Sequence, residues 1–143
     1  TSRHYAPLIR REFKYTPDKV IEDSKKINTN GKSVLVVSDE TSENTNLGKM
    51  LKRFRDSFSS EIKIINLSDI DIKGGCISCL QCGYDHKCSY LGKDGFIEFW
   101  ENIVVTSDIL VFAGVIKDRY LSAQWKMALD RAFYMTHTSY SYS

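Results

Sequence analysis

The sequence predicts an α/β domain in which the strands of a parallel sheet alternate with helices. Short runs of apolar and β-branched residues recur along the chain, and amphipathic helical patterns of about twelve residues separate them. No apolar run approaches the roughly 18 residues that a transmembrane helix needs, so we expect no membrane span. This alternation indicates crossover connections that place helices on the faces of the sheet. The 143 residues therefore predict one main domain, over residues 32–135.

Three segments have the composition of buried parallel strands. Residues 33–38 form a β-branched run, Ser-Val-Leu-Val-Val-Ser, between Gly31 and a polar stretch. Residues 62–66 and 108–114 have the same character and predict the second and third strands. A sheet of three strands is small, so we expect an incomplete sheet that another chain, or a longer version of this one, completes. Because an unpaired sheet edge recruits another strand, we also expect a homo-oligomer.

Three helices are predicted between and after these strands, each with its apolar residues at helical spacing. In the first, from Asn46 to Phe58, the apolar positions are Leu47, Met50, Leu51, Phe54 and Phe58. In the second, from Asp94 to Val105, they are Phe96, Ile97, Trp100 and Val104. In the third, from Ser122 to Tyr134, they are Trp125, Ala128, Leu129, Ala132 and Phe133.

The two ends of the chain are predicted to lie outside the main domain. Residues 1–31 read as an N-terminal arm with one short helix from Asp18 to Ile27, which Thr16 caps and Pro17 starts. Residues 136–143, rich in Ser and Tyr, read as a flexible tail. No secretory signal pattern is present at the start of the sequence, which predicts a cytoplasmic protein. A net charge of +2 predicts neither a nucleic-acid partner nor an anionic membrane partner.

A polar loop follows the first predicted strand and precedes the first predicted helix. A helix start exposes unpaired N–H groups, and hydroxyl side chains add donors, so such a loop suits a phosphate group. The candidate hydroxyl donors are Ser38, Thr41, Ser42 and Thr45. The alternative is a simple connection rich in capping residues, with Asn44 or Thr45 as the cap. The carboxylates of Asp39, Glu40 and Glu43 oppose a phosphate here unless they point away from it.

All four cysteines of the chain lie within thirteen residues, in the spacing Cys76-x2-Cys79-x2-Cys82-x5-Cys88. Thiolates at such close spacing can converge on an iron–sulfur cluster in which each of four irons takes one ligand. Zinc sites more often use two ligand pairs separated by a longer stretch. Free or redox-active thiols, zinc and disulfides remain the alternatives to a cluster. His86, inside the same segment, is a further candidate for a metal or proton role.

A third candidate site is the nine-residue loop from Gly114 to Ser122. Gly114 permits close approach of a ligand to the backbone, and an aromatic ring needs apolar walls such as Val115, Ile116 and Tyr120. The alternative is an ordinary connecting loop capped by Ser122.

These motifs together resemble the flavodoxin-like family of NAD(P)H-dependent FMN reductases and iron–sulfur flavoproteins, over about residues 33–135. The first loop resembles the family pattern through Ser38, Asn44 and Thr45. The cysteine segment after the second strand, with Lys87 before the last cysteine, is similar to that of the family. The last helix resembles the family pattern through Ser122, Ala123, Lys126, Asp130 and Arg131.

The resemblance implies a flavodoxin-like three-layer sandwich, here incomplete, that binds FMN. The FMN phosphate would lie in the 38–45 loop and the ring against the 114–121 loop, with NAD(P)H as co-substrate. The cofactor-binding residues would be Ser38, Thr41, Asn44, Thr45, Gly114, Val115, Ile116 and Ser122. In the iron–sulfur branch, Cys76, Cys79, Cys82 and Cys88 would hold a four-iron, four-sulfur [4Fe-4S] cluster beside the carboxyl ends of the strands.

The function implied is that of a redox flavoprotein that exchanges electrons with a nicotinamide or a protein electron carrier. Since the flavin carries the chemistry, no catalytic side chain is expected. The alternative is a non-catalytic iron–sulfur, zinc or thiol domain of a larger protein that has lost FMN. Asp39 and Glu40, which stand where the family commonly has Pro-Arg, motivate this alternative.

Overall fold

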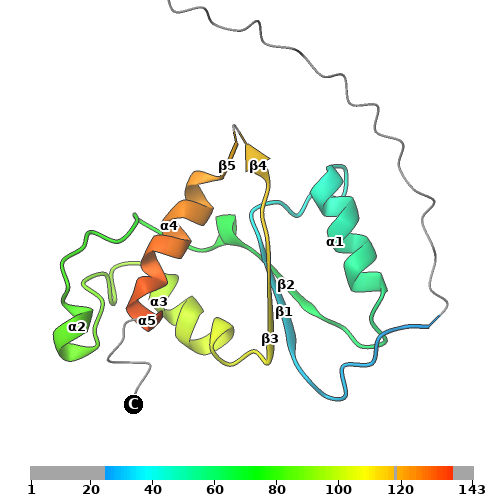
Figure 1. Cartoon of the computed structure of the whole chain (residues 1–143), viewed down its shortest axis with the longest axis horizontal. Helices are drawn as coiled ribbons and strands as arrows, with labels where there is room; N and C mark the ends of the chain where they lie inside the picture. The colour runs from blue at the N-terminus through cyan, green and yellow to red at the C-terminus, as the bar shows by residue number, and fades with distance from the viewer. Residues whose placement is uncertain (1–24, 118, 137–143) are drawn as a thin grey trace, which may run out of the picture.

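The computed structural model describes residues 25–117 and 119–136, and a three-stranded parallel sheet lies at its centre (Figure 1). The strands are β1 (Val34–Ser38), β2 (Lys63–Asn66) and β3 (Ile109–Ala113), in the spatial order β2-β1-β3. Val36 at the middle of β1 pairs with Ile64 of β2 and Val111 of β3. The three predicted strands and the α/β class are therefore confirmed, with ends that differ by about one residue.

Helices cover both faces of this sheet, which makes three layers (Figure 1). Helix α1 (Asn46–Asp56) packs on one face, where Val34 and Val36 contact the cluster around Leu51. Leu35 and Val37 point to the other face, because side chains alternate along a strand. That face carries α3 (Phe96–Phe99), the π-helical segment η2 (Trp100–Val104) and α4 (Ala123–Arg131). All five residues of β1 are buried, as predicted for a strand covered on both faces.

Three details of the prediction are wrong. The predicted third strand is not fully buried: Ile109 is 45% and Phe112 49% exposed, because β3 pairs with β1 on one side only. Met50, placed on the apolar stripe of the first helix, is exposed. The predicted helix of residues 122–134 is divided at Ala132 into α4 and α5 (Phe133–Thr136).

The described part of the N-terminal arm is extended rather than helical. Ile27 forms a parallel bridge with Phe58, and its backbone N–H donates to the carbonyl of Ser57 over 2.8 Å. The end of the helix predicted from Asp18 to Ile27 is therefore wrong, and its remainder lies outside the described residues. Thr136 belongs to α5 rather than to the predicted tail, and residues 137–143 also lie outside the described ranges.

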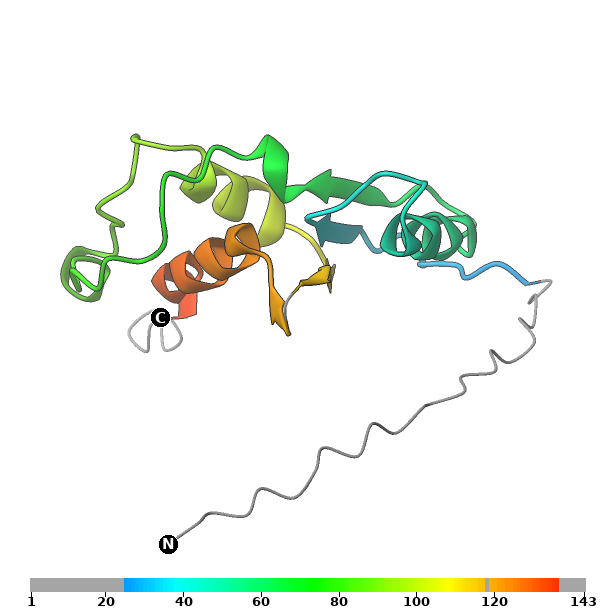
Figure 2. The same cartoon turned by 90° about the horizontal axis from the view of Figure 1, so that it is seen from above.

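A long excursion separates β2 from α3 and carries the cysteines. It begins with the short helix η1 (Leu67–Asp69) and then runs away from the sheet to α2 (Cys82–Asp85), as Figures 1 and 2 both show. After β3, a hairpin of β4 (Ile116–Lys117) and β5 (Tyr120–Leu121) replaces the predicted loop. Among the helices that the structure describes, none is long and apolar enough to cross a membrane.

Candidate functional site

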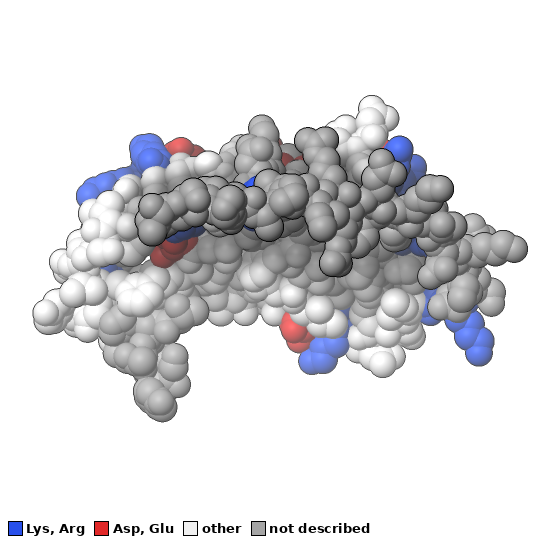
Figure 3. Space-filling model, turned by 45° about the horizontal axis from the view of Figure 1, so that its top comes forward, with Lys and Arg blue, Asp and Glu red and all other residues white. Residues whose placement is uncertain are grey.

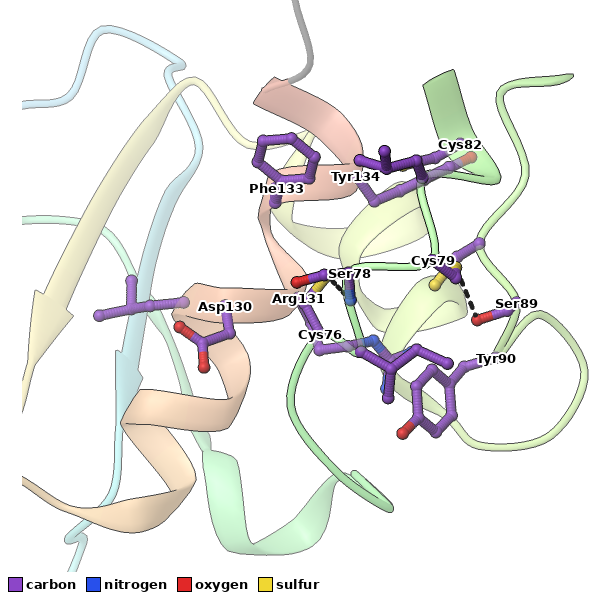
Figure 4. Close-up of a pocket in the computed structure, with 14 residues that line it drawn as sticks. Cys76, Ser78, Cys79, Cys82, Ser89, Tyr90, Asp130, Arg131, Phe133 and Tyr134 are labelled. Atoms are coloured by element: carbon purple, nitrogen blue, oxygen red, sulfur yellow. Dashed lines mark hydrogen bonds between the residues drawn. The ribbon is translucent and has the colours of Figure 1, made fainter. Parts of the chain in front are cut away.

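The four cysteines line a single cavity of about 490 Å³ between the cysteine segment and the end of α4 (Figure 4). The opposite wall comes from the residues at the junction of α4 and α5, which are Leu129, Asp130, Arg131, Phe133 and Tyr134. Leu129 and Phe133 are each 43% exposed because they face this cavity rather than the core. The structure thus brings together the cysteine residues that the sequence singled out.

The backbone of the cysteine segment takes up an unusual conformation at three positions. Ser78, Leu80 and His86 have φ angles of 54°, 58° and 57°, in the left-handed region that side chains other than glycine rarely adopt. Such conformations cost free energy and concentrate in ligand-binding loops. Ser78 and Leu80 flank Cys79 in this segment, and Cys76, Cys79 and Cys82 all line the cavity.

The thiols differ in exposure and in acidity. Cys76 and Cys79 are exposed, Cys88 is half-buried and Cys82 is buried. Hydrogen bonding to the Ser89 hydroxyl, at 3.4 Å, and to the backbone of Gln81 lowers the pKa of Cys79. Burial raises the pKa of Cys82, and the charges of the other three thiols raise it further. Cys82 therefore lies within electrostatic reach of the other three thiols.

Arg131, which lines the cavity, belongs to a buried ion pair with Asp94. The Arg131 Nη1 donates to Asp94 Oδ2 over 2.8 Å, and Nη2 donates to Asp94 Oδ1 over 3.1 Å. The side chains are 1% and 0% exposed. Tyr90 covers the guanidinium, whose carbon lies 4.0 Å from the ring centroid. Burial lowers the pKa of Arg131, but hydrogen bonding to Asp94 and the nearby Cys88 outweigh burial, so the net shift is upward.

The donor set of this cavity consists of thiols, which are ligands for soft metal centres. Four thiols around one cavity are the ligands that iron–sulfur clusters use. A single zinc ion needs all its sulfur ligands about 2.3 Å from one point. No group of three or more Cys, His, Asp and Glu in the described ranges has an arrangement of that kind. A cluster places one iron at each cysteine, so its ligands stand further apart. His86 is not among the cavity residues.

The 38–45 loop satisfies many of its polar groups internally. The Ser38 hydroxyl is fully buried, donates to the Glu40 carbonyl over 2.8 Å and accepts from the Glu40 N–H over 3.1 Å. Thr45 caps α1, where its hydroxyl accepts from Gly48 N–H and donates to the Ser42 carbonyl. Of the two predicted caps, Thr45 is the one that the structure has.

Two carboxylates of this loop accept hydrogen bonds from backbone N–H groups. Glu40 Oε1 accepts from the Ser42 N–H over 2.7 Å, and Asp39 Oδ1 accepts from the Val115 N–H over 3.0 Å. Thr41 instead points toward β2, where its hydroxyl accepts from Asn66 Nδ2 over 3.3 Å. In this arrangement the loop fits FMN phosphate only if Glu40 moves away from Ser42.

The third predicted site lies beside the first, at the carboxyl edge of the sheet. The contact of Asp39 with Val115 joins the two loops directly. Gly114 leaves no space for a side chain, since an added Cβ would lie 2.8 Å from Leu121 Cδ2 and from Trp125 Nε1. Val115, Ile116 and Tyr120 are exposed on the hairpin, and Ser122 caps α4 by accepting from the Trp125 N–H.

The cysteine cavity and this carboxyl edge are separate places. None of the residues predicted to bind FMN is among the residues that line the cysteine cavity. Ser122 stands at the start of α4 and Arg131 at its end, and nine helical residues span about 14 Å. The expectation that the cysteines lie beside the carboxyl ends of the strands is therefore wrong, because the excursion carries them along α4 to its far end.

The surface charge is mixed. On the face that Figure 3 shows, Lys and Arg side chains lie at separate places along the rim, with Asp and Glu among them. The ion pairs include Lys52 and Arg55 with Glu43, whose pKa the hydrogen bond from Lys52 lowers. This dispersion agrees with the small net charge of the chain.

Comparison with known proteins gives no match to a protein-family model, a curated protein or a solved structure. The functional argument therefore depends on the residues of this chain.

Local sequence patterns do not single out the residues beside the cysteines. Asp94 reads as the start of a helix, Tyr90 belongs to no motif, and Arg131 belongs only to the family pattern. The one available signal was an arginine within the apolar stripe of the last predicted helix, between Leu129 and Ala132. An arginine on a buried face needs a carboxylate partner, but 37 residues separate Asp94 from it, and no local pattern connects them.

Proposed function

We propose that this chain is an electron-transfer domain of the flavodoxin-like class, with a [4Fe-4S] cluster held by Cys76, Cys79, Cys82 and Cys88. The observation that carries the proposal is that all four thiols line one cavity. In the fuller form of the proposal the domain also binds FMN and belongs to the NAD(P)H-dependent FMN reductases and iron–sulfur flavoproteins.

The strand order supports the flavodoxin-like part of the proposal. The order β2-β1-β3 is the same as that of the first three strands in the flavodoxin-like arrangement 2-1-3-4-5. In such sheets a ligand binds outside the carboxyl ends of the strands on either side of β1, where the chain reverses direction across the sheet. Asp39, Val115 and Ser122 lie around this position.

The chemistry is divided between the cofactors and the chain. A bound cluster supplies one-electron transfer, and FMN would exchange a hydride with a nicotinamide. The chain holds the sulfur ligands: Ser89 orients the Cys79 thiol, the Ser78 N–H donates to Cys76 Sγ over 3.4 Å, and burial excludes water around Cys82.

One observation favours the second candidate, a cluster or thiol domain without FMN. The Glu40 carboxylate already occupies the Ser42 N–H, and no lysine or arginine stands within the 38–45 loop to offset its charge. A protein that has lost FMN would tolerate this arrangement, whereas an FMN protein must displace Glu40.

The visible spectrum and iron content of the full chain, purified without oxygen, separate these functions. A broad absorption that bleaches on reduction, with about four irons and four sulfides per chain, is expected for the cluster. Additional flavin bands support the FMN protein, and their absence supports the second candidate. A colourless protein with one zinc per chain would overturn both.

Cys79→Ala is the matching variant, and we expect it to lose the cluster absorption while it keeps any flavin signal. Ile77→Ala is the control, since Ile77 is an exposed residue of the same segment that offers no ligand. If Cys79→Ala keeps full iron, Cys79 is not a ligand.

A further inference from the structure

The buried guanidinium of Arg131 has a nitrogen, Nε, whose N–H meets no acceptor among the described residues. Its two terminal nitrogens bind Asp94, and Nη1 also donates to the Gly74 carbonyl over 3.3 Å. Within residues 25–117 and 119–136, Nε has no hydrogen-bond partner, although it is buried. Leaving a buried N–H unpaired is unfavourable, and more so when the group is charged. Such an atom in a residue that lines a cavity points to an acceptor beside it.

The position of Arg131 identifies that acceptor as sulfur. Arg131 lines the same cavity as the four cysteines, and Cys88 lies close enough to interact with its charge. Asp94 binds the terminal nitrogens and Tyr90 covers the guanidinium, so Nε is the nitrogen without a partner among the described residues. Arg131 and Tyr90 both lie beside the cysteines in Figure 4. Arginine suits this position because its planar fork can bind a carboxylate with two nitrogens and still present a third N–H.

We propose that Arg131 is the residue that positions and tunes the sulfur centre, with its unpartnered Nε–H donating to the Cys88 sulfur or a neighbouring cluster sulfide. This inference rests on the proposed cluster, and it adds a specific role for a residue that is not a ligand. Asp94 sets the orientation of Arg131 through its two contacts and is itself held by the Lys73 and Phe96 N–H groups.

The proposed role has a measurable electrostatic consequence. When the cluster is reduced it takes up one electron, its negative charge grows by one, and no bond forms or breaks. A buried positive charge and an N–H···S hydrogen bond both stabilise the more negative state, so they raise the reduction potential. The charge acts on the potential with or without the N–H···S hydrogen bond, so a variant that keeps the charge separates the two contributions. Outer-shell hydrogen bonds tune metal centres in this way.

The test is a redox titration of the full chain, purified without oxygen, with the reduced cluster followed by electron paramagnetic resonance. We expect Arg131→Gln to lower the one-electron equilibrium constant for reduction by at least about tenfold, which is 59 mV. Arg131→Lys keeps the charge but loses the Nε–H, so its shift is expected to be smaller. Arg55→Gln removes the same charge from α1 on the other face of the sheet and is the control.

A second variant keeps the test decisive if Arg131→Gln does not fold. Asp94→Asn combined with Arg131→Gln replaces the ion pair with two neutral amides of similar size, which avoids a buried unpaired carboxylate. The double variant is expected to lower the potential by less than Arg131→Gln does, because it also removes the negative charge of Asp94, while it still lacks the Arg131 Nε–H. Loss of iron from any Arg131 variant whose urea midpoint equals that of Arg55→Gln would also support the proposal.

Two results would overturn the inference, and they are distinguishable. If the Arg131 variants hold full iron and have the potential of Arg55→Gln, Arg131 does not act on the centre, although the cluster proposal stands. If the unmodified chain binds no iron and sulfide, the proposed function fails, and the role of Arg131 fails with it.

Discussion

The 38–45 loop and the cysteine segment are both polar connections that leave the sheet, but they differ in how their polar groups are satisfied. In the loop, Ser38 and Thr45 bind backbone groups of the loop itself, and Glu40 takes up the Ser42 N–H. In the cysteine segment, four thiols face a cavity and the adjoining Arg131 Nε lacks a partner. Because buried polar groups are normally hydrogen-bonded, the unmet Nε beside the cysteines calls for an explanation that the polar groups of the loop do not need.

This difference makes the cysteine segment a stronger candidate for a ligand site than the 38–45 loop. The position of the loop before a helix and its hydroxyl groups predict a phosphate site. The same hydroxyl groups can instead cap the helix, as Thr45 does. The cysteine segment keeps four free thiols after folding, because none of them forms a disulfide. The stronger functional argument therefore lies with the cysteines.

Among the variants that test this comparison, Gly48→Ala is expected to have the largest effect on the free energy of unfolding. Gly48 lies in the first turn of α1, and a Cβ there would overlap the Ser42 carbonyl. Because the loop is packed against the helix, we expect a loss of about 1–3 kcal/mol in the free energy of unfolding. Urea denaturation measures it.

Gly95→Ala is the control for this change, since its Cβ would make only ordinary contacts, 3.8 Å from Asp71. Iron content per folded chain should be the same in both variants. Equal stability of Gly48→Ala and the unmodified chain would show that the loop is loose enough to rearrange around a ligand.

Glu40→Gln tests whether the loop is blocked by its own carboxylate. The change removes a negative charge from the Ser42 N–H, and one charge at about 4 Å in water is equivalent to about 1 kcal/mol, or roughly fivefold in affinity. We expect FMN, titrated by quenching of its fluorescence, to bind about fivefold more tightly.

Glu98→Gln, which removes an exposed carboxylate from α3, should leave the FMN affinity unchanged. If Glu40→Gln does not bind FMN better than Glu98→Gln does, the charge of Glu40 is not what limits the loop.

The smallest effect concerns Asp108, another carboxylate that is satisfied internally. It accepts from the Ser33 N–H and hydroxyl over 2.8 Å each and from Lys32 Nζ over 3.1 Å, which ties the start of β3 to that of β1. These contacts, the Ser33 N–H first, lower the pKa of Asp108 from 3.8 to about 2. Because the folded-state pKa is the lower one, the stabilisation is complete above pH 3.8 and is lost as the pH falls toward 2.

Urea denaturation of Asp108→Asn at several pH values checks this sign. The unmodified chain should be more stable than the variant at pH 7, and the difference should shrink below pH 4. Glu61→Gln, an exposed acidic residue before β2, should show no such pH-dependent difference. A difference between Asp108→Asn and the unmodified chain that stays constant down to pH 2.5 would contradict the assignment.

The elements that the sequence predicted well are those set by short-range patterns. The β-branched run of β1 and the apolar stripe of α1 are properties of consecutive residues, and both elements form where the patterns place them. The helix predicted over 94–105 forms as α3 and η2, and its apolar residues Phe96 and Ile97 are buried. The exposure of Phe112 could not be predicted, because it depends on which strands pair with β3.

In the candidate site, too, some features follow from the local sequence and others depend on tertiary packing. The sequence by itself determined the four thiols, their spacing and the turn-rich segment that carries them, because these are properties of residues 76–88. Only the tertiary structure decided that the segment faces the end of α4, that Asp94 and Arg131 pair beneath it, and that Glu40 occupies the Ser42 N–H. Packing brings residues together across long stretches of chain to satisfy buried charges and donors, and local periodicity carries no information about such partners.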